Sequence, residues 1–258
     1  MSRYEYLLQR RPLLLNSVLL RQNPNNVHEW LNRVQLYEDF PEKQIETFEE
    51  GIKAVKPKEQ TGKFCDLWIA YAKFYEQQNQ LDLAKKTFER AILVNFPKVD
   101  DLAIVWAEYA EFTLRHSGYE ETSKLLKRAV TAPPKRASYH DEKADVQQRV
   151  FKSLRVWSLY ADVEETFGTV ESCKAVYEKI LDLRIATPQT VVNYGMFLEE
   201  NQYFEDAFKA YEKGIGIFRW PQVYSIWNVY LTKFVQRYGG KKLERARDLF
   251  EQCLENCP

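Results

Sequence analysis

The sequence predicts an all-α protein, a right-handed α-solenoid built of stacked helical hairpins. Three observations predict this fold. An apolar anchor, Trp in all but one case, recurs six times, and a Tyr follows it by three residues in five of the copies. In most copies an aromatic–acidic pair comes about 20 residues after the anchor. The spacing between most anchors falls in the range of roughly 34 to 40 residues that is typical of a helical-hairpin repeat.

The repeat positions indicate which side chains form the core, because each unit buries its apolar side only against its neighbours. The anchors are Trp30, Trp68, Trp106, Trp157, Val191 and Trp227. The Tyr residues that follow are Tyr71, Tyr109, Tyr160, Tyr194 and Tyr230, with Arg33 in the first copy. The later pairs are Phe48-Glu49, Phe88-Glu89, Tyr177-Glu178, Tyr211-Glu212 and Phe250-Glu251, with Leu126-Lys127 in the third copy. Because the Trp residues occupy a fixed position in the repeat, they are interpreted as core residues and not as platforms on which nucleic-acid bases stack.

The second copy shows how one unit forms a hairpin. Residues 66–77 carry apolar side chains at three- and four-residue spacing, which predicts an amphipathic helix. Residues 78–80 are a polar turn, and residues 81–93 form the second helix. Ala84 is small where the two helices approach closely. Pro97 ends the unit because proline cannot continue a helix. The prolines that close other hairpins are Pro57, Pro133, Pro188 and Pro221.

The whole chain, residues 1–258, is predicted to be a single array of about six hairpins from a longer protein. A helix over about residues 12–21 precedes the first hairpin. An insertion at about residues 133–150 separates the third and fourth anchors, and its composition predicts a projecting loop with a helix in its second half. Gly239-Gly240 lengthens the last turn.

The charge of the chain is balanced, with 37 basic and 37 acidic residues, so no global field attracts nucleic acid. One stretch, residues 233–247, is locally basic, with only Glu244 to oppose it. It is interpreted as a solvated helix surface or, alternatively, as a contact with RNA or a protein partner. The candidate contact residues are Lys233, Arg237, Lys241, Lys242 and Arg245.

A search for catalytic chemistry finds no constellation of the kind that enzymes use. His28, His116 and His140 have no histidine partner at helical spacing. Adjacent helical residues such as Glu89 and Arg90 point about 100° apart and cannot act on one substrate atom. We expect this Glu to reach a neighbouring helix instead. The cysteines, interpreted as reduced packing residues, are Cys65, Cys173, Cys253 and Cys257.

We therefore expect no enzyme activity, no cofactor and no metal site. The longest apolar stretch near the N-terminus, residues 13–20, is too short to span a bilayer, and no membrane association is expected.

The pattern W-x-x-Y followed by [FY]-E-[RK]-[AG]-[IL] resembles the half-a-tetratricopeptide, or HAT, repeat; residues 88–92 and 246–251 match it most clearly. Four longer strings resemble the Syf family of pre-mRNA splicing factors, which includes an XPA-binding protein and is related to crooked-neck. They are R-R-P-L-L-L-N-S-V-L-L-R-Q-N-P (10–24), K-A-V-Y-E-K-I-L-D-L-R-I-A-T-P (174–188), Y-L-T-K-F (230–234) and R-Y-G-G-K-K-L-E-R-A-R-D-L-F-E-Q (237–252). The similarity covers essentially the whole chain.

The resemblance implies a nuclear splicing scaffold, of which this chain is the N-terminal to middle part. The partners that it implies are a crooked-neck-type HAT protein, an Aquarius-type helicase and members of the Nineteen complex. It also implies a link to transcription-coupled DNA repair. The favoured function is a non-catalytic protein–protein scaffold in the spliceosome. The alternative is a single-stranded RNA-binding module that uses residues 233–247. The apolar residues of the last helix further predict self-association of the chain as a homodimer.

Overall fold

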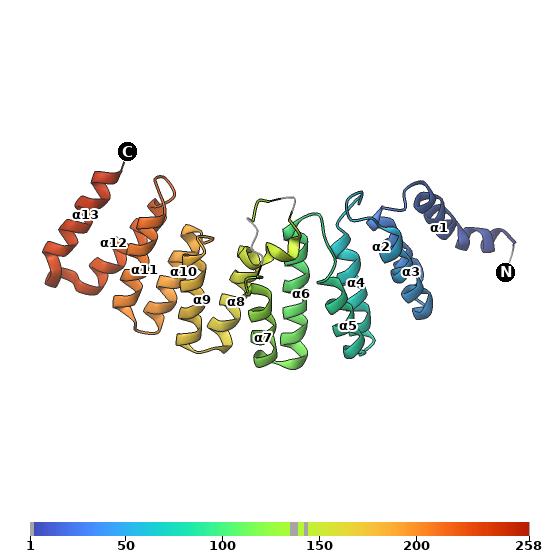
Figure 1. Ribbon diagram of the computed structural model, residues 1–258, viewed down its shortest axis with the longest axis horizontal. Helices are drawn as coiled ribbons and strands as arrows, with labels where there is room; N and C mark the ends of the chain where they lie inside the picture. The colour runs from blue at the N-terminus through green and yellow to red at the C-terminus, as the bar shows by residue number, and fades with distance from the viewer. Residues whose placement is uncertain (1–2, 135–138, 142–143, 258) are drawn as a thin grey trace. The chain divides into compact units, whose positions relative to one another are not determined.

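The computed structural model describes residues 3–134, 139–141 and 144–257, and over these residues every regular element is a helix. The chain forms two compact units, residues 1–159 and 160–258, which we describe separately. In each unit, antiparallel helices pair into hairpins and successive hairpins pack side by side (Figure 1). The prediction of an all-α solenoid is confirmed; its right-handed sense and its continuity as one array stay predictions.

The first unit begins with a helix that precedes three hairpins. Its helices are α1 (Arg3–Gln22), α2 (Val27–Leu36), α3 (Pro41–Ala54), α4 (Phe64–Gln77), α5 (Leu81–Ala91), α6 (Val99–Ser117) and α7 (Tyr119–Val130), followed by the 3₁₀ turns η1 (Val146–Gln148) and η2 (Val150–Lys152) and the start of α8 (Leu154–Phe167). The hairpins are α2–α3, α4–α5 and α6–α7, and their first helices, α2, α4 and α6, pack in sequence.

The second unit begins within α8 and continues the same pattern. Its further elements are α9 (Val170–Asp182), α10 (Pro188–Glu200), α11 (Phe204–Ile217), α12 (Tyr224–Tyr238), η3 (Gly239–Lys242) and α13 (Leu243–Asn256). Local signals set the starts of α9 and α10. Thr169 and Thr187 each accept a hydrogen bond from a backbone N–H three residues later, in a reciprocal capping box. Pro188 occupies the first turn of α10, where a missing N–H has no cost.

Close approach of paired helices depends on small side chains. Ala84 on α5 is fully buried against α4, as predicted, and Thr122, Cys173 and Ala207 are equally buried at the matching places. On α10, Gly195 allows the Tyr211 ring to lie against the helix backbone, because a Cβ there would come within 2.2 Å of the ring carbon atoms. The small side chains therefore allow the two helices of a hairpin to pack in direct contact.

The repeat anchors lie in the cores of the two units. Trp30, Trp68, Trp106, Trp157, Val191 and Trp227 are buried, and so are the Tyr residues Tyr71, Tyr109, Tyr160, Tyr194 and Tyr230. Phe48, Phe88, Tyr177 and Tyr211 are buried as well, together with Leu126 in the third copy. In each unit the aromatic residue of a second helix stacks on or tilts against the Tyr of the next hairpin. The pairs are Phe48–Tyr71, Phe88–Tyr109, Tyr177–Tyr194 and Tyr211–Tyr230.

The interpretation of Phe250 as a core anchor is wrong. Its side chain is 45% exposed, whereas its neighbour Leu249 is buried. The physical reason is that the matching aromatic residues are covered by the Tyr of the following hairpin, and α13 is the last helix of this chain. Leu254 on the same helix is 70% exposed. Self-association through this surface stays a prediction.

Two element boundaries differ from the sequence prediction. The first helix begins at Arg3, not near residue 12, because Pro12 is accommodated inside α1. The second half of the insertion forms the 3₁₀ turns η1 and η2 instead of a helix. Val146, Val150 and Phe151 are buried there, so this part is packed against α6 and α7 and does not project. Residues 135–138 and 142–143, within the predicted loop, lie outside the described residues.

Replacement of Trp68 by Ala should destabilise the first unit by about 3–5 kcal/mol, because the side chain is buried between α4 and its neighbours. Leu93→Ala, at a residue that is 78% exposed in the same hairpin, should change the free energy of unfolding by less than about 0.5 kcal/mol. Hydrogen exchange should show lost protection around α4 and retained protection in α10–α12. An equal loss of protection along the whole chain would contradict a repeat stack.

Gly195→Ala and Gly216→Ala should have opposite effects on stability. The methyl group that Gly195→Ala adds would overlap the buried Tyr211 ring, which predicts a loss of about 1–3 kcal/mol. Gly216 is helical with open space around it, and Gly216→Ala should be neutral or stabilise by up to about 1 kcal/mol. Chemical denaturation of the two variants measures both effects. Equal effects would mean that α10 and α11 do not approach closely.

Candidate functional site

The second helix of four hairpins, α3, α5, α9 and α11, carries a Glu that contacts both helices of the next hairpin. On α3, the Glu49 Oε1 atom accepts a hydrogen bond of 3.1 Å from the Tyr71 hydroxyl on α4. The same carboxylate pairs with the Arg90 guanidinium on α5, at 2.8 and 3.2 Å. We call such a set, a Glu with the Tyr and the basic residue of the next hairpin, an inter-hairpin clamp.

The clamp recurs at the next interface of the first unit. The Tyr109 hydroxyl on α6 donates to Glu89 on α5 at 2.8 Å, and Arg128 on α7 donates to both carboxylate oxygens at 2.9 and 3.0 Å. The ring of Phe88 stacks on Tyr109 with centroids 5.1 Å apart and planes inclined by 8°. The prediction that this Glu reaches a neighbouring helix is confirmed.

The second unit contains two more clamps. Glu178 on α9 accepts from the Tyr194 hydroxyl at 3.2 Å and from Lys213 at 2.6 Å. Glu212 on α11 accepts from the Tyr230 hydroxyl at 2.7 Å and from Arg245 at 3.2 Å. In α11 the cation, Lys213, follows the aromatic residue Tyr211. In α13 the cation, Arg245, instead comes before the aromatic residue Phe250, so it lies on an earlier turn of the helix. The sequence analysis predicted that such a Glu reaches a neighbouring helix, but it did not predict the basic partners.

The electrostatics of the first clamp favour a charged Glu49 and a protonated Tyr71. The hydrogen bond from Arg90 lowers the pKa of Glu49. Burial raises the pKa of Tyr71 and Tyr109 well above the usual tyrosine range, so their hydroxyls remain hydrogen-bond donors. The Arg90 guanidinium also lies 5.3 Å from the ring centre of Trp68, the anchor of its own hairpin. The clamp thus joins the anchor, the Tyr and the preceding hairpin.

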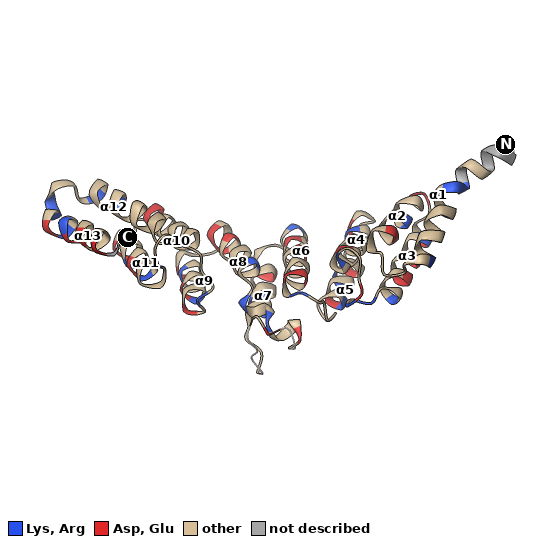
Figure 2. Cartoon of the chain, turned by 90° about the horizontal axis from the view of Figure 1, so that it is seen from above, with Lys and Arg blue, Asp and Glu red and all other residues tan. Residues whose placement is uncertain are grey.

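The basic stretch near the C-terminus is not an open positive patch. Lys233 forms an ion pair with Glu199 at 2.9 Å, and Arg245 pairs with Glu212. Lys242 lies 3.7 Å from Glu205 and 3.7 Å from the centre of the Tyr238 ring. Arg237 lies over the Phe204 ring at 3.7 Å. Glu244 is the only acidic residue within the stretch itself, and acidic residues of the preceding hairpin lie against its cations. Both signs of charge occur along α13 (Figure 2).

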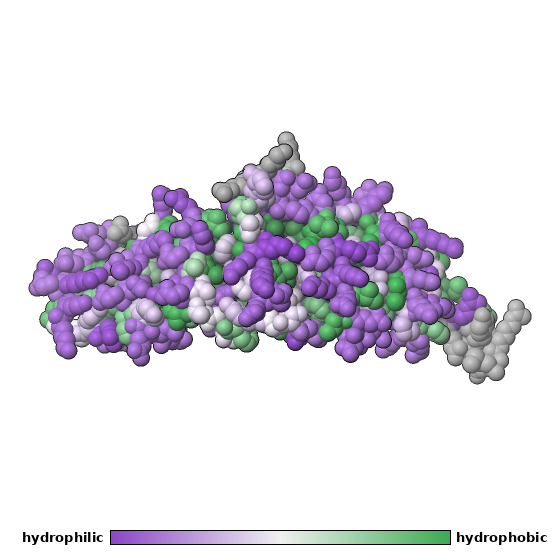
Figure 3. All heavy atoms as spheres, turned by 60° about the horizontal axis from the view of Figure 1, so that its bottom comes forward, coloured by the Kyte–Doolittle hydropathy of each residue, from purple (hydrophilic) through white to green (hydrophobic). Residues whose placement is uncertain are grey.

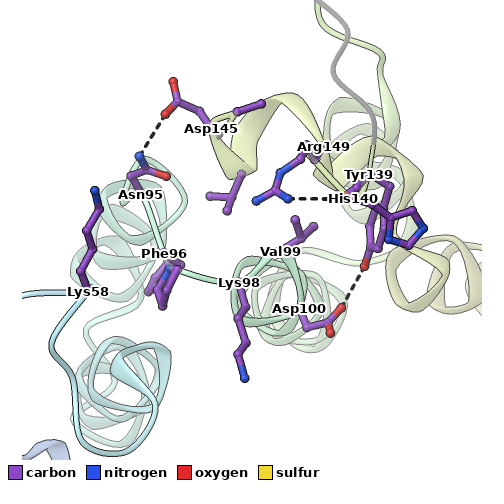
Figure 4. A pocket seen from close by; sticks show the side chains of 13 residues that line it. Lys58, Asn95, Phe96, Lys98, Val99, Asp100, Tyr139, His140, Asp145 and Arg149 are labelled. Atoms are coloured by element: carbon purple, nitrogen blue, oxygen red, sulfur yellow. Dashed lines mark hydrogen bonds between the residues drawn. The ribbon is translucent and has the colours of Figure 1, made fainter. Parts of the chain in front are cut away.

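A pocket of about 730 Å³ lies where the insertion meets the α5–α6 turn, and sequence reasoning did not find it. Figure 4 shows its walls: Asn95, Phe96 and Asp100 from the turn and the start of α6, and Tyr139, Asp145 and Arg149 from the insertion. Asn95 donates to Asp145 at 3.0 Å, and the Tyr139 hydroxyl donates to Asp100 at 3.0 Å. In the sequence, only the length of the insertion indicated that this part of the chain has a special role.

The cysteines and histidines that the structure describes do not gather into a site. Cys65 and Cys173 are buried free thiols, and burial raises the pKa of each to about 12. His116 bonds to Glu76 at 2.7 Å, in an exposed contact between α6 and α4. Within the described ranges, no three His, Cys, Asp or Glu side chains cluster as metal ligands would. None of the helices, as far as the structure describes them, is long and apolar enough to cross a bilayer.

The surface is mainly hydrophilic, with apolar residues scattered between polar side chains on the face shown in Figure 3. The first helix is different, since it exposes a row of apolar side chains opposite its contact with α2. These residues are Leu7, Leu8, Leu14, Leu15 and Val18. On the opposite side of α1, Asn16 is buried and donates to the Glu29 carboxylate at 2.9 Å and to the Glu29 carbonyl oxygen at 2.8 Å.

Comparison with known proteins identifies related repeats along the whole chain. The family model of the pre-mRNA-splicing factor Syf1/CRNKL1 C-terminal HAT repeat matches residues 57–258, and that of the SYF1 middle HAT repeat matches residues 1–55. The placement in an N-terminal to middle part is therefore wrong for residues 57–258. The core pattern is the same in every hairpin, so it does not encode a position along an array.

Three similar proteins illustrate the relationship. The chain is 58% identical to a pre-mRNA-splicing factor syf1 homolog of Drosophila melanogaster, 58% to pre-mRNA-splicing factor SYF1 of Homo sapiens and 47% to pre-mRNA-splicing factor cwf3 of Schizosaccharomyces pombe. All of this chain is covered in each case, and it spans 29%, 30% and 33% of the three relatives. A solved structure of the TPR protein YrrB aligns with 83% of this chain and 96% of its own, at 10% identity and a TM-score of 0.38.

The first clamp predicts a stability difference that depends on pH. Because the pKa of Glu49 is lowered in the folded state, its contribution is present above the usual carboxyl range and is lost as pH falls through the folded pKa. Glu49→Gln should cost about 1 kcal/mol at pH 7 and less at a pH below the usual carboxyl range. Glu50→Gln, an exposed neighbour on α3, is the matched control and should have little effect at either pH. A cost for Glu49→Gln that is the same at both values would exclude a charged clamp.

Proposed function

The chain belongs to the HAT-repeat family of the pre-mRNA-splicing factors Syf1 and CRNKL1, and we propose that it is a non-catalytic scaffold for protein–protein interaction in the spliceosome. The observation that carries this proposal is the recurrent clamp, joined to the family match. A solenoid offers side chains of successive hairpins as an extended binding surface, and clamps keep those side chains in register. Nuclear localisation is part of the proposal, and the splicing function of the relatives supports it.

The absence of a catalytic role rests on what the charged residues do. General acid–base catalysis requires a titratable group that can reach a substrate atom. The Glu residues of the clamps instead hold the Tyr and the Arg or Lys of the next hairpin, as Glu89 holds Tyr109 and Arg128. These carboxylates are committed to keeping neighbouring hairpins in place, which supports a structural role.

The proposed partners are proteins of the splicing machinery. The resemblance of the sequence to the Syf family suggests a crooked-neck-type HAT protein, an Aquarius-type helicase and members of the Nineteen complex. The link to transcription-coupled DNA repair is a further expectation of the same resemblance. Protein partners are favoured over RNA because the cations of residues 233–247 already have acidic or aromatic neighbours. Binding RNA through them would require several of these contacts to be broken.

A charge reversal at Lys241 and Lys242 separates the protein scaffold from the RNA-binding alternative. Both residues are exposed. We expect the isolated chain to bind single-stranded RNA weakly at physiological salt, and the double change to Glu to alter this little. In the full-length protein, purified from cells with its assembly, the same change should remove protein cross-links near α13. The matched control reverses Lys85 and Lys86, an adjacent exposed pair on α5.

RNA binding by the isolated chain would decide against the scaffold if it were tight at physiological salt, steeply salt-dependent and abolished by the Lys241 and Lys242 change alone. Cross-linking mass spectrometry of the assembly provides the second readout. A full-length protein that shows no cross-links from residues 1–258 to other splicing proteins would also contradict the proposal.

A further inference from the structure

Arg149 is a buried cation that lacks an anionic partner among the residues that the structure describes. Its side chain is 5% exposed and lies on the wall of the pocket between the insertion and the α5–α6 turn. Within the described ranges the guanidinium makes one hydrogen bond, from Nη1 to the Tyr139 carbonyl oxygen at 3.2 Å, and its buried Nε has no partner. An arginine has five N–H donors, so most of its hydrogen-bonding capacity toward the described residues is unused.

The two carboxylates in the pocket walls do not neutralise this charge. Asp100 accepts the Tyr139 hydroxyl, and Asp145 accepts the Asn95 amide. Neither lies within ion-pair distance of Arg149 in the described part of the chain. A buried charge without a partner is unfavourable, and proteins therefore pair such groups. The pocket wall therefore presents a buried cation with unused hydrogen-bond donors.

The backbone holds Arg149 in this place. Arg149 lies between the 3₁₀ turns η1 and η2, and Val146 in η1 and Val150 in η2 are buried. Gln147 donates from its side chain to the carbonyl oxygen of Val94 at 2.9 Å, which ties η1 to the end of α5. Figure 4 shows the guanidinium directed toward the centre of the pocket, with a bond drawn from one of its terminal nitrogens. The cation is thus positioned before any ligand arrives.

We propose that this pocket binds the carboxylate of a Glu or Asp side chain on an acidic segment of a partner protein, an inference that rests on the proposed scaffold function. The planar guanidinium matches a carboxylate and can donate two parallel hydrogen bonds to it. Lys58 and Lys98 are exposed at the rim and attract further acidic residues of the segment. Phe96, Val99 and Val146 provide apolar wall for the methylene groups of the bound side chain.

A single carboxylate fits the charge of the pocket better than a nucleic acid does. Among the residues that the structure describes, the lining holds Lys58, Lys98 and Arg149 against Asp100 and Asp145, a small positive excess. One inserted carboxylate balances that excess. A planar carboxylate also matches the fork of the guanidinium, from which it can accept two parallel hydrogen bonds. The partner is therefore a protein segment with acidic side chains.

Titration of the full 258-residue chain with an acetylated, amidated tetraglutamate peptide tests the proposal, with tetraglutamine as the control peptide. The Nε–Hε resonance of Arg149 in an ¹⁵N spectrum reports the contact directly. We expect tetraglutamate, and not tetraglutamine, to shift it. Arg149→Gln should weaken binding by about tenfold or more. Asp145→Asn keeps an oxygen for Asn95 but removes a negative charge, and should tighten binding severalfold.

Two further variants keep the test valid if Arg149→Gln fails to fold. Lys98→Gln, at the exposed rim, should weaken tetraglutamate binding severalfold, and Lys127→Gln, exposed on α7 outside the pocket, should not. The proposal is overturned if tetraglutamate leaves the Arg149 resonance unchanged, or if an octauridine RNA binds there more tightly than the peptide. These outcomes concern the isolated chain, so they are independent of the cross-linking result that tests the scaffold function.

Discussion

The carboxylate that one hairpin extends to the next is the contact on which the rest of each unit depends. A hairpin of two helices buries too little apolar surface to be stable alone, and stacking supplies the remainder. Stacking by apolar contacts has little directional preference, because it depends mainly on area. The Glu of the clamp adds direction: it bonds to a Tyr on one helix and to an Arg or Lys on the other, as Glu89 does with Tyr109 and Arg128. Both helices of the next hairpin are positioned by one residue.

The sequence predicts the features that recur, and it fails where the structure depends on residues distant in sequence. The hairpins, the buried anchors and the small residue Ala84 follow from periodicity, because a position that repeats in phase has the same surroundings in each unit. The ion pairs of the basic stretch could not be predicted, because Glu199 and Glu212, the partners of Lys233 and Arg245, lie on the preceding hairpin. Phe250 was misread because an aromatic residue of a second helix is covered only by the hairpin that follows it.

The insertion could not be predicted for a different reason. It has no counterpart in the other copies, so no repetition defines its inward positions. Its buried residues are held by contacts peculiar to it, such as the bond from Gln147 to the Val94 carbonyl oxygen. The cation of Arg149, which has no acidic partner among the described residues, arises in this part of the fold. The regular hairpins use their charges in clamps, whereas the irregular segment leaves one charge for a partner, which is how a uniform repeat acquires a specific binding site.

A double-mutant cycle between Glu89 and Tyr109 tests the role of the clamp most directly. The free energy of unfolding is measured for the wild-type chain, Glu89→Gln, Tyr109→Phe and the double variant, since Phe keeps the stacking on the Phe88 ring and removes only the hydroxyl. We expect a favourable coupling energy of about 0.5–2 kcal/mol at pH 7. Additive effects of the two substitutions, with no coupling, would contradict the claim that this carboxylate joins successive hairpins.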